Sequence, residues 1–135
     1  MPGINYLAVI VAAVAAIVVG AVWYSPLLFG KAYMKLRGMN PDATTNRRPP
    51  AGELIAEFVR YVVIAFVLAL FVVRLGVVGL TSALELGLGL WFGFQAMLLL
   101  GSVIHEKMPW TLYAIHAGDA LVKTVLMAVI LGVWR

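Results

Sequence analysis

Three polar residues interrupt the last apolar segment of the chain: His116, Asp119 and Lys123. Their spacing of three and four residues places Asp119 beside both of the others on one side of a helix. At 1.5 Å per residue from Trp110, Asp119 lies about 13 Å and Lys123 about 19 Å into that helix. Charged groups at this depth are costly, and they are candidates for a proton or ion pathway. A buried ion pair that only fixes the register of the helices is the structural alternative.

Four further residues are expected to reach the same depth from the other apolar segments: Tyr24, Glu57, Arg60 and Gln95. We expect Arg60 to pair with Asp119. Lys123 would share the Asp119 carboxylate with Arg60. Either Gln95 or Tyr24 would complete the hydrogen bonds of that carboxylate. Without a carboxylate beside it, Lys123 would tend to lose its proton. The alternative for Glu57 and Arg60 is local, because an acid suits the first turns of a helix and a long arginine side chain can reach back to the interface.

Other chemistry has little support in the sequence. His116 and Asp119 have a spacing that a metal ion could use, but two ligands do not make a metal site, so none is predicted. Cysteine is absent, and no serine lies beside a histidine and an aspartate in the pattern of a catalytic triad. The glycines at 87, 89 and 93 alternate with bulky apolar residues, which indicates helix packing and not a phosphate-binding loop. We therefore predict no enzyme activity and no cofactor.

Membrane-spanning helices must position the polar residues. Of the 135 residues, 64% are hydrophobic and 12% are charged, and the mean hydropathy is +1.02. Soluble proteins carry about 25% charged residues, so a soluble globule and a disordered chain are both excluded. Four stretches reach the length of about 20 apolar residues that a transmembrane helix needs: residues 4–29, 53–75, 82–104 and 111–134. We predict an all-α integral membrane protein, a single domain over residues 1–135 with four antiparallel transmembrane helices in a bundle.

Basic residues gather on one side of the predicted membrane. The first loop, residues 30–52, and the third loop contain six: Lys31, Lys35, Arg37, Arg47, Arg48 and Lys107. The other side has only Arg74 and Arg135. Because basic loops stay in the cytosol, both termini are expected on the non-cytosolic side of a bacterial cytoplasmic membrane. The net charge of +4 follows from this asymmetry, so no nucleic-acid partner is expected. Alternating apolar and basic residues also predict a short amphipathic helix early in the first loop.

Small residues recur at intervals of four in three of the apolar segments. They are Ala8, Ala12, Ala16 and Gly20 in the first, Gly89 and Gly93 in the third, and Ala120, Thr124, Ala128 and Gly132 in the fourth. Lipid tails are as apolar as leucine, so close approach at such positions is what holds membrane helices together. The stripes predict packing within the chain or, alternatively, a face for a second copy. The second segment, which carries several phenylalanines, is expected to face lipid or to fill space in the bundle.

The first apolar segment ends in Trp-Tyr-Ser-Pro at residues 23–26, and Phe-Gly-Lys follows at residues 29–31. This pattern resembles the DUF1761 family of small bacterial membrane proteins, whose first helix typically ends in a similar stretch. The residues from Pro109 and Trp110 to the final Leu-Gly-Val-Trp at 131–134 are also similar. The resemblance covers the full length of the chain. It implies a four-helix membrane topology and no catalytic residue.

These observations predict a non-enzymatic membrane protein with a structural or interaction role. Its partners would be the lipid bilayer and either further copies of itself or a larger membrane complex to which it is an accessory subunit. The small size of the chain, the lack of a polar domain and the small-residue stripes favour this function. The alternative is a small transporter or channel that moves a proton or a small solute through the layer of Arg60, Asp119 and Lys123.

Overall fold

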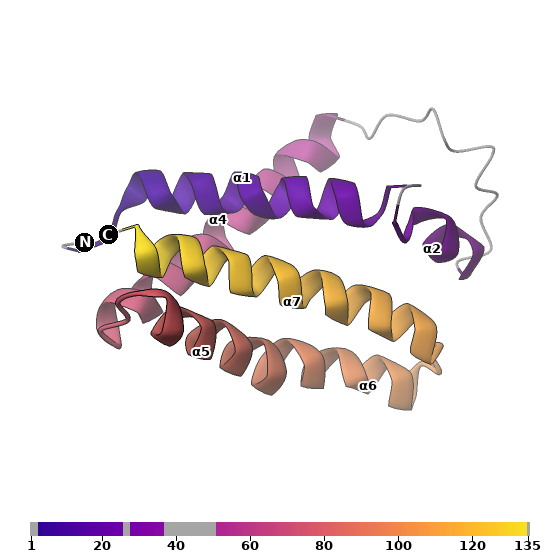
Figure 1. The fold of residues 1–135 in the computed structure, drawn as a ribbon. Helices are drawn as coiled ribbons and strands as arrows, with labels where there is room; N and C mark the ends of the chain where they lie inside the picture. Colours follow the sequence, from indigo (N-terminus) through magenta and orange to yellow (C-terminus); the bar gives the residue numbers. More distant parts are fainter. Residues whose placement is uncertain (1–2, 26–27, 37–50, 135) are drawn as a thin grey trace.

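The computed structural model describes residues 3–25, 28–36 and 51–134, and within these ranges the chain is helical and has no strand (Figure 1). The elements are α1 (Tyr6–Trp23), α2 (Gly30–Leu36), α4 (Ala51–Arg74), α5 (Leu80–Leu90), the π-helix η1 (Trp91–Ala96), α6 (Met97–His105) and α7 (Trp110–Val133). α5, η1 and α6 follow one another without a break. Four helices in the described ranges are long and apolar enough to cross a membrane: α1, α4, the continuous helix Leu80–His105, and α7. The all-α prediction is therefore confirmed.

The first helix is shorter than predicted. It ends at Trp23 and not near residue 29, because Ser25 precedes a proline and the helical conformation is disfavoured there. The amide of Gly30 donates to the carbonyl of Ser25 (2.9 Å), so Gly30 lies close to the end of α1. A Cβ atom on Gly30 would overlap the backbone of Tyr24 and Ser25, so this close approach requires glycine. α2 supplies a short helix where an amphipathic one was predicted, and residues 37–50 of the loop lie outside the described residues.

α7 is the central helix of the structure. It packs against α1, α4 and α5, and α1 also packs against α4 (Figure 1). α1 and α7 run in opposite directions, as two contacts between them show. At one end the side chain of Asn5 donates to the carbonyl of Trp134 (3.4 Å). At the other end the indole of Trp23 donates to the carbonyl of Ile115 (2.9 Å). The two termini therefore lie together, and α2 lies at the opposite end (Figure 1).

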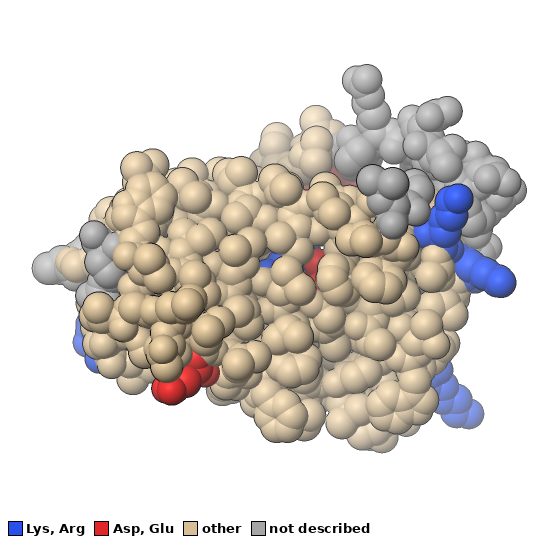
Figure 2. Space-filling model, viewed as in Figure 1, with Lys and Arg blue, Asp and Glu red and all other residues tan. Residues whose placement is uncertain are grey.

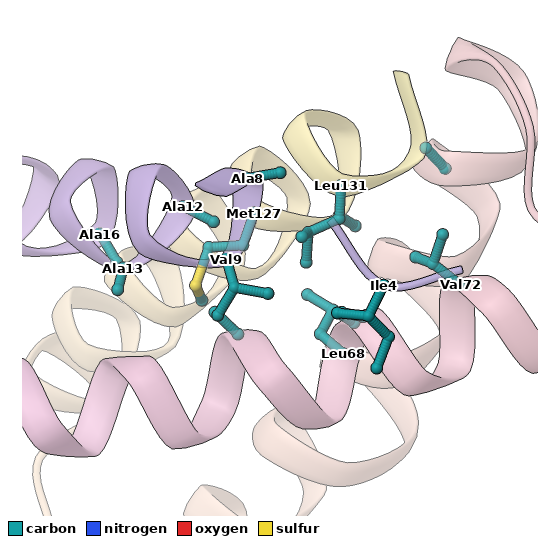
Figure 3. Packing of buried hydrophobic residues seen from close by; sticks show 14 of the residues in the cluster. Ile4, Ala8, Val9, Ala12, Ala13, Ala16, Leu68, Val72, Met127 and Leu131 are labelled. Atoms are coloured by element: carbon teal, nitrogen blue, oxygen red, sulfur yellow. The ribbon is translucent and has the colours of Figure 1, made fainter. Parts of the chain in front are cut away.

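The core fills the half of the molecule that contains the termini (Figure 3). Ala8, Ala12 and Ala16 of α1 are completely buried, so the first small-residue stripe is used inside the chain. α4 was expected to face lipid or to fill space, and it meets this core with its own small residues, Ala65 and Ala69. Short side chains on both helices let the backbones approach closely, which is what stabilises helix pairs in lipid. From α7 the core receives Met127, Ala128 and Leu131.

The third span packs through a different face from the one predicted. Ala83 and Gly87 are buried, and a Cβ atom on Gly87 would lie 3.0 Å from the Cα of Val125 on α7. Gly89 and Gly93 are exposed, and a Cβ atom on either would meet nothing within 4 Å. Because each helical residue turns by about 100°, Gly89 points away from the face of Gly87. These two glycines therefore do not pack inside the chain, and a face for a second copy is the interpretation that stays open for them.

The outer surface has the character of a membrane protein. Large apolar side chains are exposed along α1, α4 and the third span. Figure 2 shows that one face is almost entirely free of charge over the middle of the helices, and that blue lysine and arginine side chains gather at the end where α2 lies. Apolar flanks with charged ends are what a bilayer requires of its helices.

Candidate functional site

A buried ion pair on α7 forms the centre of the candidate site. Lys123 Nζ lies 2.8 Å from Asp119 Oδ2, and the two residues are only 7% and 8% exposed. Their spacing of four residues on one helix makes the contact local, as the sequence predicted. Lys123 Nζ also donates to the hydroxyl of Tyr61 on α4, at 2.5 Å. The ammonium is thus held by a carboxylate on its own helix and a phenol on a neighbouring one.

Asp119 Oδ1 is buried and has no hydrogen-bond partner among the described residues. A carboxylate oxygen that has lost its water without gaining a donor is destabilising, at a cost of about 1–3 kcal/mol or more. Lys123 occupies the other oxygen of the same carboxylate. Asp119 therefore keeps one acceptor available inside the protein.

Arg60 does not pair with Asp119. Its guanidinium donates to both carboxylate oxygens of Glu57, at 2.8 and 3.2 Å, and to the hydroxyl of Tyr61 at 3.1 Å. The side chains of Arg60 and Glu57 are 56% and 47% exposed, so this pair stands on the outer face of α4. The expected pairing is corrected because a carboxylate three residues away on the same helix is closer than one on another helix.

Tyr61 is the residue that sequence reasoning missed. Its hydroxyl accepts from Lys123 and from Arg60, and thereby connects the buried ion pair to the exposed one. The sequence did contain an indication that Tyr61 belongs to the polar site. Tyr61 is the one tyrosine in an otherwise apolar stretch of α4, and a buried phenol needs a polar partner.

Tyr24 and His116 form a second polar pair towards α2. The Tyr24 hydroxyl is hydrogen-bonded to His116 Nδ1 at 2.7 Å, and the ring of Tyr33 on α2 lies edge-on to both side chains, at 5.1 and 5.5 Å between ring centres. Burial and the nearby Asp119 carboxylate raise the pKa of Tyr24, so the phenol stays protonated at neutral pH. Tyr24 was expected to bond Asp119, and its hydroxyl is engaged by His116 instead.

The π-helix η1 holds the third span against α7. Gln95 Oε1 accepts from the hydroxyl of Thr124 (2.5 Å), so Gln95 binds the neighbour of Lys123 and not Asp119 as expected. The hydroxyl of Tyr113 donates to the carbonyl of Ala96 (2.9 Å), and the indole of Trp91 donates to that of Ala117 (2.8 Å). A π-helix turn is rare and frequently marks a functional site.

All seven residues of the predicted polar cluster line one cavity of about 600 Å³. They are Tyr24, Glu57, Arg60, Gln95, His116, Asp119 and Lys123, joined by Tyr33, Tyr61 and Thr124. The walls come from the C-terminal part of α1, the N-terminal part of α4 and the middle of α7. Exposed Glu53 and Arg60 and half-buried Glu57 stand at its mouth, and Met127 lines it at the level where the core begins. Ala120 also lines it.

The groups that line the cavity are able to form ion pairs and hydrogen bonds with a bound molecule. Among the described residues no three His, Asp or Glu side chains lie together as a metal ion would require. What the cavity offers is two ion pairs, several hydroxyl groups and one carboxylate oxygen with an available lone pair.

The sequence model of one protein family, described as a protein of unknown function (DUF1761), matches residues 7–132 of the chain. The chain belongs to the DUF1761 family. No curated protein and no solved structure matches it. In this DUF1761 protein the Trp-Tyr pair at residues 23 and 24 lies against the site. Trp23 packs so closely on Gly118 that a Cβ atom there would lie 2.8 Å from the indole, and Tyr24 reaches His116.

The pairing pattern predicts unequal effects of two substitutions in this DUF1761 protein. Asp119→Asn leaves the Lys123 ammonium buried without its carboxylate, and loss of one partner of a buried pair costs about 3–5 kcal/mol. Arg60→Met breaks an exposed pair, worth about 0–1 kcal/mol, and one hydrogen bond to Tyr61, worth about 1 kcal/mol. Denaturant unfolding of the protein in detergent micelles measures both free energies of unfolding.

The matched control is the double variant Asp119→Asn with Lys123→Met. It removes the stranded charge and should recover most of the stability that Asp119→Asn loses. Equal losses in Asp119→Asn and Arg60→Met would contradict the pairing.

Proposed function

We propose that this protein is a small membrane carrier that binds a proton or a small solute in the cavity between α1, α4 and α7 and passes it across the bilayer. One observation carries the proposal: a buried Asp119–Lys123 pair faces the cavity with one carboxylate oxygen that no described residue binds. Ionisable groups that face a cavity inside membrane helices typically belong to transport pathways. No catalytic step is part of this function.

The shape of the cavity favours a carrier over a channel. The cavity lies in the half of the molecule next to α2, and its lining on α7 ends at Met127. The other half is occupied by the tightly packed core, in which Ala8, Ala12 and Ala128 are fully buried. A site that is accessible from one side and closed at the other fits alternating access around a central binding site.

We further propose that the four long helices form an antiparallel bundle in a bacterial cytoplasmic membrane. Lys31, Lys35 and Lys107 stand at the end of the helices where α2 and the turn between α6 and α7 lie. By the positive-inside rule this end is cytosolic, and both termini are on the other side. The cavity would then open towards the cytosol.

Flux measurements test the carrier function. Liposomes containing the wild-type protein and an entrapped pH-sensitive dye are expected to lose an imposed pH gradient faster than protein-free liposomes, or to do so once a co-transported solute is added. Asp119→Asn with Lys123→Met should return the rate to that of protein-free liposomes, because the polar pair that carries the charge is gone. The control Glu85→Gln changes an exposed acid on α5 outside the cavity and should keep the wild-type rate.

A wild-type protein that is folded and shows no flux under any gradient or solute tried would contradict the carrier function. So would a double variant that transports as fast as the wild type.

The proposed orientation is tested by labelling single cysteines, which the cysteine-free chain makes possible without background. Val78→Cys and Glu106→Cys place thiols at exposed positions at opposite ends of the third span. A membrane-impermeant maleimide added to intact cells should label residue 78 and should reach residue 106 only after the cells are opened. The reverse pattern would contradict the orientation.

The exposed face of the third span favours a second candidate function, assembly with further copies or with a larger complex. Between Leu80 and His105 only Ala83, Gly87 and Ala96 are buried. An apolar groove of about 370 Å³ runs between α4 and this span, lined among others by Phe71 and Phe94. A smooth, unpaired face of this kind is typical of a surface where membrane helices associate.

Bulky substitutions on that face test the assembly. A Cβ atom at position 89 or 93 would meet nothing within 4 Å, so Gly89→Leu with Gly93→Leu should leave the stability unchanged while any oligomer dissociates. Native mass spectrometry of the extracted protein measures the stoichiometry. Gly52→Leu, at an exposed position of α4 with equal space, is the control. An oligomer that survives the double substitution would exclude this face from the interface.

A further inference from the structure

We propose that the cavity takes a small molecule of zero net charge that donates an N–H or O–H hydrogen bond to Asp119 Oδ1. The inference deepens the proposed function, because it names the class of solute for the same cavity. It rests on the carrier proposal only for the claim that the solute crosses the membrane. Binding itself can be tested without any transport.

The first step is the requirement for a donor. Asp119 is 8% exposed and lines the cavity, and an ionised carboxylate can only accept hydrogen bonds. Lys123 satisfies Oδ2 at 2.8 Å, whereas Oδ1 is bound by none of the described residues. Oδ1 has an accessible surface below 1 Å², so a ligand reaches it once the carboxylate turns about the Cβ–Cγ bond towards the cavity. A hydrogen bond to Oδ1 would then recover the cost of burying that oxygen. A ligand with acceptors alone would leave the cost in place and bring its own unsatisfied groups.

The second step concerns net charge. Each acid deep in the cavity or on its wall lies beside a base: Asp119 beside Lys123, and Glu57 beside Arg60. Glu53 at the mouth is exposed. A net charge brought into this balanced cavity would have no opposite charge to neutralise it, and an unpaired charge in a low-dielectric site is expensive. The ammonium of Lys123, next to Asp119, also repels a cation at Oδ1. Neutral and zwitterionic solutes are therefore favoured over ions.

The third step concerns the body of the ligand. Aromatic rings of Tyr24, Tyr33 and His116 gather near the α2 end, with ring centres 5.1 to 5.9 Å apart. Aliphatic side chains of Ile17 and Ile64 complete the wall. A cavity of about 600 Å³ is within the range that holds a drug-sized molecule, roughly 300–1,000 Å³. These aromatic and aliphatic side chains, which lie beside the polar groups of the cavity, fit an amphipathic solute with an apolar body and a donor at its head.

A matched series of probes tests these three steps on the intact protein. The series is 4-phenyl-1-butanol, its methyl ether, 4-phenylbutyrate and (4-phenylbutyl)trimethylammonium, which share a body and differ in head group. Isothermal titration calorimetry in lipid nanodiscs measures the affinities, and empty nanodiscs correct for partition into lipid. We expect the alcohol to bind about tenfold or more tightly than the ether, because a hydrogen bond to a charged group is worth about 1.5–3 kcal/mol. Both charged probes should bind more weakly than the alcohol.

A variant assigns the preference to Asp119. Asp119→Leu with Lys123→Met removes the whole ion pair and should reduce the alcohol-to-ether ratio of affinities to about one. The control Glu85→Gln should keep the wild-type ratio.

If the double variant does not fold, infrared spectroscopy of the aspartate-labelled protein takes the place of the affinity measurement on that variant. The chain has two aspartates, Asp42 and Asp119, so Asp42→Asn leaves a single ¹³C-labelled carboxylate. Its band should shift with the alcohol and stay in place with the ether.

The outcomes separate this inference from the carrier function. Equal affinities for alcohol and ether, a charged probe that binds most tightly, or a carboxylate band that the alcohol leaves in place would each overturn the inference. Flux in liposomes together with any of these results would leave the carrier function standing alone. Donor-selective binding in a protein that shows no flux would support the ligand class and contradict the carrier.

Discussion

A charged lysine inside an apolar helix is the constraint on which the arrangement of the helices depends. The Lys123 ammonium is buried, so acceptor groups must surround it, and no single helix supplies all of them. Asp119 comes from the same helix, whereas Tyr61 must be brought by α4. α1 contributes space, because a Cβ atom at Gly20 would lie 3.0 Å from Lys123 Nζ. Three helices therefore converge on one ammonium, and the cavity is the space that remains where they diverge again towards α2.

The forces that hold the helices together differ between the two halves of the molecule. In the half with the termini, alanines of α1 and α4 are fully or almost fully buried, and the contact is made by close packing alone. In the other half, aromatic side chains donate to backbone carbonyls across the helices, as Trp23 does to Ile115 and Trp91 does to Ala117. Such bonds have value in lipid because no water competes for the carbonyl. α7 is thus fixed from both sides at the level of the cavity.

Much of the fold could be predicted from the sequence, because the length and hydropathy of the apolar segments determine where the long helices begin and end. Three of the four long helices begin and end within two residues of the predicted positions. The Asp119–Lys123 pair was also predictable, since a spacing of four on one helix makes it a local contact. Contacts between helices were not, because hydropathy says nothing about rotation of a helix about its axis. The sequence could not distinguish Gly87, which packs on α7, from Gly89, which faces outward, or reveal that Tyr61 and not Arg60 meets the buried pair.

The same division into halves bears on how the proposed carrier would open to the far side. For alternating access, the contacts that must separate are those of the closed half, where α1 meets α7 through Ala8, Ala12 and Met127 (Figure 3). Apart from the exposed 3.4 Å bond between Asn5 and Trp134, these contacts are apolar and join small alanines to the longer Met127. Contacts with lipid tails compensate for part of the lost apolar packing, whereas the hydrogen bonds around the cavity have no substitute in the bilayer. The polar half would therefore act as the pivot and the small-residue half as the gate.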